Sequence, residues 1–265
     1  MRIPKHIGII PDGNRRWAKH AGLQKKDGYA HGLTPGLDLL RLARSAGIQE
    51  ITYYGFTTDN CGRPPEQVQA FSSACVEAVN LIASDPVSLL VVGDQDAPNI
   101  FPKELLPYTT RRDFNGGGIR VNFLVNYGWE WDLAKLHTPG KNRPNICSQL
   151  HSHDISRVDL VIRWGGMRRL SGFLPVQSVY AEFLCCRPVM AGFSTRGFCS
   201  GTGVVSKARC HIGRLTFPET AVFFFTSFPN PHNNRRKIFK NSGETEKMVL
   251  PFSSPVDFSS SGVVC

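Results

Sequence analysis

Short apolar runs alternate with helical patterns along the first two thirds of the chain. Runs of five to seven mostly apolar residues predict buried strands at 6–10, 51–56, 88–92, 119–125 and 158–162. Apolar spacing predicts one helix after Pro35 that ends near Gly47, and a second over 65–82. Near-continuous apolar strands separated by helices are typical of a mostly parallel sheet with helices on both faces. The pattern therefore predicts an α/β fold.

Composition changes abruptly near residue 183. The chain of 265 residues has a net charge of +10, yet residues 1–183 hold 21 basic and 17 acidic side chains. Residues 184–265 hold 10 basic and 4 acidic side chains, and five of the eight cysteines. Such a break is typical of a boundary. It predicts a folded domain over 1–183 and an aberrant, irregular tail over 184–265.

Several broad classes are excluded by what the sequence lacks. No run reaches the ~18 apolar residues of a membrane span, and the first residues show no secretory signal. No cysteine spacing matches a zinc site, and neither common glycine-rich nucleotide-binding motif is present. Most of the excess positive charge lies in the tail, so nucleic acid is not an expected partner. These features favour a cytoplasmic globular protein.

Polar residues follow four of the five predicted strands. In a parallel sheet, ligands bind beyond the carboxyl ends of the strands. Arginine, amide and hydroxyl groups and helix N-termini bind anions there, and a carboxylate holds Mg²⁺. Any one such segment is typical of a surface turn, whereas four together predict a diphosphate site. The four segments are 12–17, 57–64, 126–128 and 163–171.

The order and spacing of these segments resemble the cis-prenyltransferase family. The matching stretches are HIGIIPDGNRRWA (6–18), GFTTDNCGRP (55–64), NYG (126–128) and DLVIRWGGMRRLSGFLPVQSVYAEF (159–183). The resemblance covers nearly all of 1–183. It implies Mg²⁺-dependent condensation of isopentenyl diphosphate with an allylic prenyl diphosphate, to form a cis-prenyl diphosphate. It also implies a homodimer, and peripheral membrane contact through a lipid product.

The resemblance also implies roles for individual residues. Asp12 would hold Mg²⁺ with Glu182 as a second carboxylate, while Asn60 and Arg63 match positions linked to catalysis and loop closure. The residues implied to bind substrate at the allylic side and around it are Gly13, Asn14, Arg15, Arg16, Trp17, Lys25, Tyr29 and Thr57. Those that match the isopentenyl diphosphate site are Arg163, Arg169 and Ser171.

Some positions depart from the family pattern. Lys25 and Tyr29 stand where long-chain enzymes usually carry Arg and His, and Trp164 replaces a small residue. The stretch 132–159 is also shorter than in long-chain synthases. Product length and allylic primer therefore stay open. The alternatives are a short-chain product, head-to-middle coupling of two allylic diphosphates, and a non-catalytic or decayed family member; the presence of Asp12 favours catalysis.

The residues after Phe183 do not continue the family pattern. Shifting the codons by one base turns Met190-Ala191 into a forced Trp, and permits LWPDF and further family-like residues up to Arg214. We therefore hypothesise a one-nucleotide frameshift near Phe183; the alternative is a genuine lineage-specific tail. In the family this region contributes to the dimer, so the hypothesis predicts that the 265-residue chain is poorly soluble or weakly active.

Overall fold

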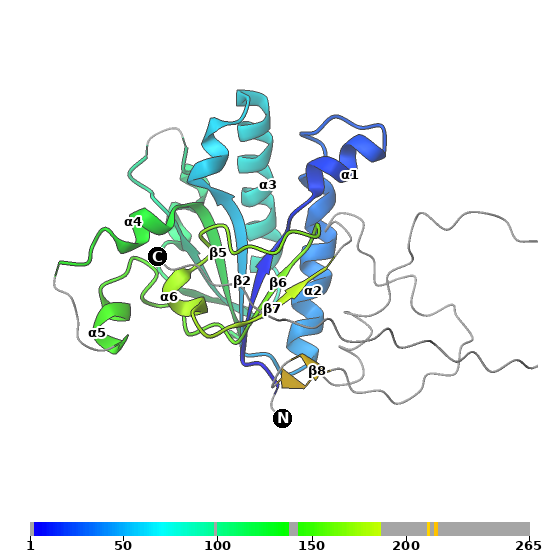
Figure 1. Ribbon diagram of the computed structural model, residues 1–265. Helices are drawn as coiled ribbons and strands as arrows, with labels where there is room; N and C mark the ends of the chain where they lie inside the picture. Colours follow the sequence, from blue (N-terminus) through cyan, green and yellow to red (C-terminus); the bar gives the residue numbers. More distant parts are fainter. Residues whose placement is uncertain (1–2, 98–99, 138–142, 187–210, 213–214, 217–265) are drawn as a thin grey trace, which may run out of the picture. The chain divides into compact units, whose positions relative to one another are not determined.

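The computed structural model describes residues 3–97, 100–137, 143–186, 211–212 and 215–216. All of them belong to one compact unit that spans residues 1–228. Its sheet has seven strands in the order β4-β3-β5-β2-β1-β6-β7 (Figure 1). Their bounds are β1 His6–Ile10, β2 Glu50–Thr57, β3 Val87–Val92, β4 Arg112–Phe114, β5 Ile119–Tyr127, β6 Leu160–Arg163 and β7 Glu182–Cys185.

The mostly parallel α/β sheet is confirmed. Within this seven-stranded sheet every neighbouring strand pair is parallel except β3 with β4. The five predicted strands are β1, β2, β3, β5 and β6. The pattern missed β4 and β7. The three residues of β4 are mostly exposed and the four of β7 are only partly buried, so neither strand gives the apolar run of a buried strand.

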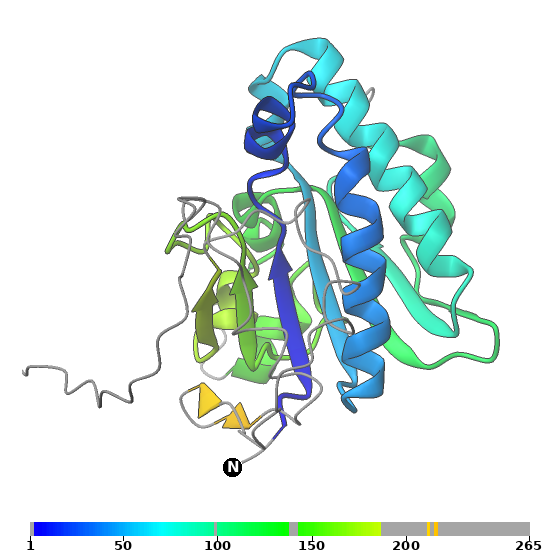
Figure 2. The ribbon, with the colours of Figure 1, turned by 90° about the vertical axis from the view of Figure 1, so that its right-hand side faces the viewer.

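Helices lie on both faces of the sheet (Figures 1 and 2). The helices and 3₁₀ turns are α1 Asn14–His20, η1 Ala30–Gly32, α2 Leu33–Ser45, η2 Thr58–Gly62, α3 Pro65–Ala83, η3 Lys103–Tyr108, α4 Trp129–Leu133, α5 Arg143–Ser148 and α6 Pro175–Ser178. The predicted helix near Pro35 begins two residues earlier, which places proline in the first turn, where a missing N–H is tolerated. The second predicted helix is α3, one residue longer than expected.

Alternate residues of the strands enter two separate cores. On one face Ile9 and Ile51 are fully buried beneath α2 and α3, which pack against each other. On the other face Val161 and Phe173 are fully buried near α6 and its flanking segments. Residues i and i+1 of a strand point to opposite faces, which is why near-continuous apolar runs are needed to supply both cores.

Little of the predicted tail lies within the described residues. β7 crosses the predicted boundary at residue 183 and ends at Cys185, and Cys186 is buried. Two short antiparallel strands, β8 His211–Ile212 and β9 Leu215–Thr216, are also described. The prediction of an irregular tail otherwise falls outside the described residues.

Candidate active site

A polar cavity of about 330 Å³ lies at the carboxyl ends of β1, β2 and β6. It brings together twelve of the predicted site residues, from segments that are far apart in the sequence. They are Asp12, Gly13, Asn14, Arg15, Arg16, Tyr29, Thr57, Asn60, Arg63, Arg163, Arg169 and Ser171. Five arginines and two aspartates line this cavity, so its charge favours an anion.

Asp12 joins two of the arginines. One carboxylate oxygen accepts Arg163 Nη2 at 2.8 Å, and the other accepts Arg16 Nη2 at 3.3 Å. Arg163 is the last residue of β6 and its side chain is 5% exposed, whereas the Arg16 side chain is half exposed. The Asp12 carboxylate thus orients both the buried Arg163 guanidinium and the exposed Arg16 guanidinium.

Arg16 also explains one glycine of the RWGG segment. Its Nη2 donates to the Gly165 carbonyl at 3.0 Å. Gly165 has a φ of 83°, and a Cβ at this position would lie 2.4 Å from Arg16 Nη2. A side chain here would need a left-handed backbone and would displace the Arg16 guanidinium from its bond, so the position favours glycine.

The segment after β2 supplies a second wall. The Asn60 side-chain oxygen accepts the Thr57 N–H at 3.5 Å and closes a capping box over η2. Arg63 donates to the Tyr29 hydroxyl at 3.0 Å, and its guanidinium lies 5.6 Å from the centre of the Phe71 ring. Tyr29 stacks on Phe71 with ring centres 4.4 Å apart. These contacts fix Arg63 at the cavity edge.

An apolar pocket of about 80 Å³ adjoins the polar cavity. Its walls come from α2, α3 and the sheet, and include Leu37, Ala74, Cys75, Ala78, Ile82 and Phe123. Burial raises the pKa of the Cys75 thiol to about 12, so this side chain stays neutral and contributes only apolar surface. Pro11, Asn14, Tyr29, Gly55 and Phe71 line both spaces. The polar cavity could therefore hold the anionic head of a ligand while the adjoining pocket holds its apolar tail.

Comparison with known proteins identifies the family. A family model described as "Putative undecaprenyl diphosphate synthase" matches residues 10–202. The chain belongs to this undecaprenyl diphosphate synthase family. The family resemblance and the assignment as a prenyltransferase of isoprenoid biosynthesis are thereby confirmed.

Individual relatives cover most of the domain. Isoprenyl transferase 2 of Streptomyces coelicolor is 34% identical over 211 residues, which cover 72% of this chain and 82% of that protein. The ditrans,polycis-undecaprenyl-diphosphate synthase ((2E,6E)-farnesyl-diphosphate specific) of Wigglesworthia glossinidia brevipalpis is 25% identical over 240 residues, 84% of this chain and 92% of that protein. The solved lavandulyl diphosphate synthase of Lavandula x intermedia, in complex with dimethylallyl diphosphate, has a TM-score of 0.63 at 20% identity and covers 73% of this chain and 91% of that one. This last likeness shows the fold.

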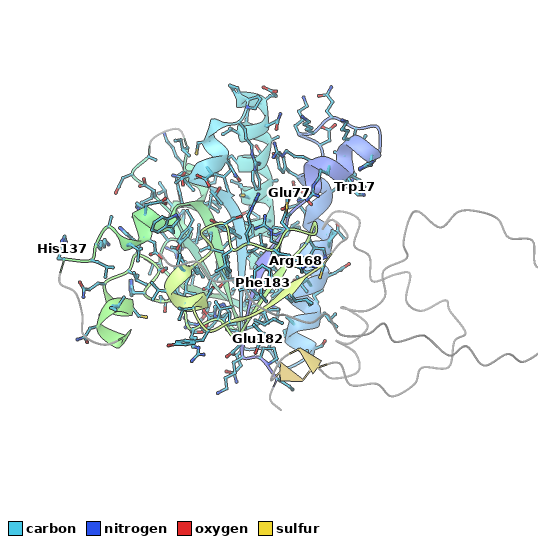
Figure 3. The ribbon with its side chains drawn as sticks, viewed as in Figure 1. Trp17, Glu77, His137, Arg168, Glu182 and Phe183 are labelled. Atoms are coloured by element: carbon cyan, nitrogen blue, oxygen red, sulfur yellow. The ribbon has the colours of Figure 1, made fainter. Side chains whose placement is uncertain are left out.

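Three predicted site residues of this undecaprenyl diphosphate synthase family member lie outside the polar cavity. Trp17 of α1 packs on His31 with ring centres 4.6 Å apart, and Lys25 is exposed. Glu182 begins β7 opposite Leu160, about 10 Å along the strand from its carboxyl end. Figure 3 shows Glu182 and Trp17 near opposite ends of the sheet. Glu182 thus stands at the amino end of β7, and its role as a second carboxylate for Mg²⁺ stays a prediction.

The NYG segment, whose first two residues end β5, supports the neighbouring loops and does not line the cavity. Asn126 is buried with a φ of 52°, and its amide donates to the Asp94 carbonyl at 2.9 Å. Its side-chain oxygen accepts the Cys61 thiol at 3.7 Å. The buried Tyr127 hydroxyl donates to Asp132 at 2.7 Å. These bonds tie β5 to neighbouring loops.

Sequence reasoning missed several residues that line the cavity, among them Tyr54, Asp59 and Phe71. Asp59 lies within the quoted GFTTDN stretch, which was the available signal. Tyr54 and Phe71 are apolar positions of a predicted strand and a predicted helix. Their periodicity marks them as buried but does not say which side chain reaches the end of the sheet.

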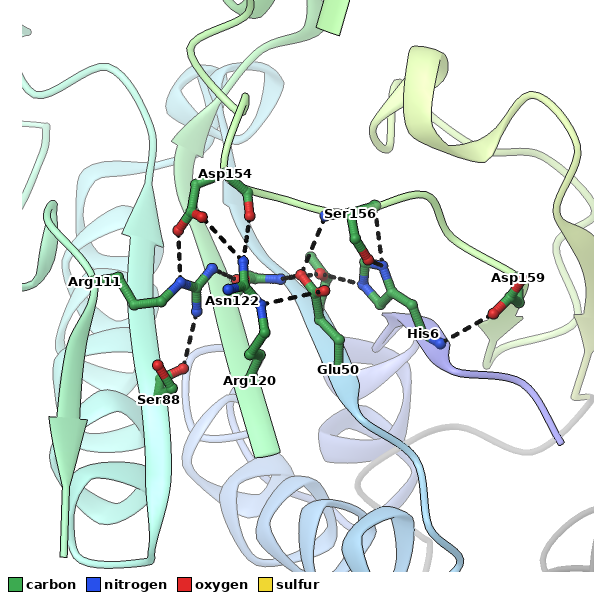
Figure 4. Close-up of polar contacts among 10 residues, drawn as sticks. His6, Glu50, Ser88, Arg111, Arg120, Asn122, Asp154, Ser156 and Asp159 are labelled. Carbon is green, nitrogen blue, oxygen red and sulfur yellow. Dashed lines mark hydrogen bonds and ion pairs between the residues drawn. The ribbon is translucent and has the colours of Figure 1, made fainter. Parts of the chain in front are cut away.

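A second polar cluster lies at the amino ends of the strands (Figure 4). Glu50, the first residue of β2, accepts Asn122 Nδ2 at 2.7 Å and pairs with Arg120 at 3.4 Å. Burial alone would raise the pKa of Glu50, but the neighbouring His6, the Ser156 N–H, Asn122 and Arg120 together outweigh it and hold that pKa below its usual value. Asp154 pairs with Arg120 at 3.0 Å, and also with Arg111.

His6 completes this amino-end cluster in its neutral form. Nδ1 lies 3.1 Å from the Ser156 carbonyl and must donate to it, so Nε2 accepts the Thr52 hydroxyl at 2.8 Å. Burial lowers the pKa of His6. The cluster satisfies its own members and is separate from the polar cavity.

Asp12 is the predicted metal ligand that fits the cavity. Mg²⁺ is usually held by one or two carboxylates together with substrate phosphates and water. The Asp12 side chain is 28% exposed among the arginines of the polar cavity, so a diphosphate and an ion would both reach it. Within the described ranges no three His, Cys, Asp or Glu side chains cluster as a complete metal site.

Proposed function

We propose that this chain transfers an allylic prenyl group from its diphosphate to isopentenyl diphosphate, with formation of a new cis double bond. The observation that carries the proposal is the junction of the arginine-rich cavity with the apolar pocket between α2 and α3. The cavity would hold the two diphosphates and the pocket would hold the allylic hydrocarbon. Catalysis of this reaction requires both environments side by side. The anionic diphosphate departs with the bonding electron pair, and positive charge develops on the allylic carbon of the apolar chain.

The reaction breaks the allylic C1–O bond, whose electron pair leaves with the diphosphate. The terminal double bond of isopentenyl diphosphate supplies the electrons of the new carbon–carbon bond, and a proton is lost from its C2. Arg16, Asn14 and Arg63 would bind the departing diphosphate, and Arg163, Arg169 and Ser171 the one that is retained. The apolar wall would exclude water from the allylic cation.

The cofactor in this proposal is Mg²⁺, and Asp12 would hold it. When bound, the ion would neutralise charge on the departing diphosphate. Asp12 would at the same time keep Arg163 oriented, as its 2.8 Å ion pair does here.

The small apolar pocket supports a short allylic primer. Only about 80 Å³ is open between α2 and α3, where Leu81 and Ile82 also form the wall. A short-chain product, or head-to-middle coupling of two allylic diphosphates, is therefore the second candidate function. The non-catalytic alternative is less well supported, because Asp12 and Arg16 both line the cavity and pair with each other.

We propose a homodimer, transient membrane contact through the product, and a cytoplasmic location. In the sheet order of the described residues β7 is the last strand, so its outer edge offers backbone groups for assembly. None of the helices in the described ranges combines the length and apolarity that a bilayer-spanning segment needs. The frameshift near Phe183 belongs to the same proposal, since the restored frame would supply the family's own continuation of β7.

The decisive experiment incubates the purified chain with labelled isopentenyl diphosphate and allylic primers of increasing length, with Mg²⁺ or with a chelator. We expect Mg²⁺-dependent prenyl diphosphate formation, and higher activity when the reading frame after Phe183 is restored. Asp12→Ala should abolish turnover. Absence of product in both frames with every primer would reject the transferase proposal, and product formed only from two allylic diphosphates would establish head-to-middle coupling instead.

A further inference from the structure

The turn after β6 is held in an unusual backbone conformation. Ser171 has a φ of 51° and Leu174 a φ of 36°, and Gly172 between them has a φ of 76°. Residues with a side chain are strained in the left-handed region, so contacts elsewhere must maintain this conformation. Ser171 and Arg169 of this turn line the polar cavity.

This backbone conformation directs the Ser171 side chain toward two arginines. Ser171 Oγ accepts Arg163 Nη1 at 2.8 Å and Arg169 Nε at 3.3 Å. Arg163 also donates to the Arg169 carbonyl, and its other terminal nitrogen pairs with Asp12 at 2.8 Å. The turn therefore determines where both guanidinium groups stand in the cavity.

Tyr54 holds the turn from β2, two strands away in the sheet. Its hydroxyl donates to the Ser171 carbonyl at 2.8 Å. The residue is 7% exposed, and its ring meets the Phe173 ring edge-on, with ring centres 5.4 Å apart. Burial raises the pKa of Tyr54, so the hydroxyl keeps its proton and remains a donor. The register of β2 with β5 is irregular directly after Tyr54, and such irregularities re-aim side chains near functional sites.

The other side of the turn is covered by Trp129. A Cβ at Gly172 would lie 2.8 Å from Trp129 Cδ1 and 3.4 Å from the Tyr54 hydroxyl. Glycine thus permits the turn to fit between these two aromatic side chains. The Trp129 residue is itself 44% exposed, so Tyr54 is the buried support.

We propose that Tyr54 is a positioning residue for the isopentenyl diphosphate half of the site. It acts through the Ser171 carbonyl, which keeps the turn in the form that orients Arg163 and Arg169. The inference deepens the proposed function and rests on it. Tyr54 lies outside the apolar pocket, so its hydroxyl should matter for the retained diphosphate rather than for the allylic chain.

The first test is Tyr54→Phe, which keeps the ring and removes the hydrogen bond. The Kd of isopentenyl diphosphate alone, measured by titration calorimetry, and its KM should rise about five- to tenfold, the size of one lost neutral hydrogen bond. The kcat and the KM of the allylic diphosphate should change less than about twofold. Tyr127→Phe is the matched control, because it removes a buried tyrosine hydroxyl that bonds to Asp132 and not to the turn. That control should lower the melting temperature and leave both KM values unchanged.

A double-mutant cycle with Ser171→Ala then separates positioning from direct contact. If Tyr54 acts through the turn, Tyr54→Phe should weaken isopentenyl diphosphate binding less in the Ser171→Ala background than in the wild type. Equal losses in both backgrounds would overturn the proposal in favour of direct contact with substrate. Unchanged binding by Tyr54→Phe in an active enzyme would overturn it as well. A wild-type chain that neither binds nor consumes isopentenyl diphosphate would instead reject the proposed function itself.

Discussion

The two ends of the parallel strands carry polar clusters of opposite character. At the amino ends Glu50, Asp154 and His6 are each bonded to donors or acceptors within the cluster, and Glu50 is 4% exposed. At the carboxyl ends five arginines face only two aspartates around an open cavity. The polar groups of the amino-end cluster bond to one another. The carboxyl-end cavity has an excess of positive charge that an anionic ligand can neutralise.

Structural and functional polar residues of this fold therefore differ in where their partners come from. A buried group whose partners are all within the protein contributes to stability, and its loss leaves those partners unsatisfied. A group that lines a cavity with unbalanced charge contributes to binding. Substitutions at one end should therefore change unfolding, and substitutions at the other should change turnover.

The largest effect is expected for Asp12→Asn. It removes the charge that would hold Mg²⁺ and that orients Arg163, so kcat/KM should fall about 10³-fold with little change in folding. Asp154→Asn is the control at the other end, where the carboxylate pairs with Arg111 and Arg120. Steady-state kinetics and thermal unfolding of both variants would check this. Comparable loss of turnover in Asp154→Asn would erase the distinction between the ends.

The next effect is on stability. Glu50→Ala leaves Asn122 and Arg120 without their shared acceptor, so the free energy of unfolding should fall by about 3 kcal/mol. Activity per folded molecule should stay the same, since Glu50 lies at the amino end. Urea unfolding with an unchanged m-value, combined with active-site titration, measures both quantities. A stable but inactive Glu50→Ala variant would contradict the structural assignment.

Arg63 and Lys25 together test where the substrate-binding cavity ends. Arg63 lines it and is held by the Tyr29 hydroxyl, whereas Lys25 is exposed and outside it. Arg63→Ala should raise the KM of the allylic diphosphate about tenfold, the size of a lost charge-assisted bond. Lys25→Ala should change it less than about twofold. If Lys25→Ala has the larger effect, then the loop that carries Lys25 closes over the substrate.

The smallest expected effect is a pH dependence of stability from His6. Its pKa is lowered by burial, so below the unfolded value of about 6.5 the unfolded chain binds a proton that the folded chain does not. Stability should therefore be complete above that pH and fall as the pH drops through it. Denaturant unfolding from about pH 7.5 to about pH 5.5 should show a shallower slope for His6→Gln. An unchanged slope would mean that other groups cause the pH dependence.

Much of this could be predicted from the sequence because the signals are local. The apolar runs at 6–10 and 119–125 mark strands whatever surrounds them, and the DGN segment and Arg163–Ser171 follow strands that could be recognised. Once the sheet is parallel, the ends of those strands must share an edge. Twelve predicted site residues consequently line one cavity.

The tertiary structure determines the distances between segments. It also determines whether a side chain lies at the amino or the carboxyl end of the strands. Glu182 and Arg163 both lie in or beside apolar runs, but only strand pairing shows that one begins β7 and the other ends β6. Tyr54 is one of two adjacent tyrosines, and the sheet turns it alone toward the Ser171 carbonyl. A sequence pattern records alternation along one segment. Register and strand order come from the burial of all segments together, and these place a side chain at a particular end and face.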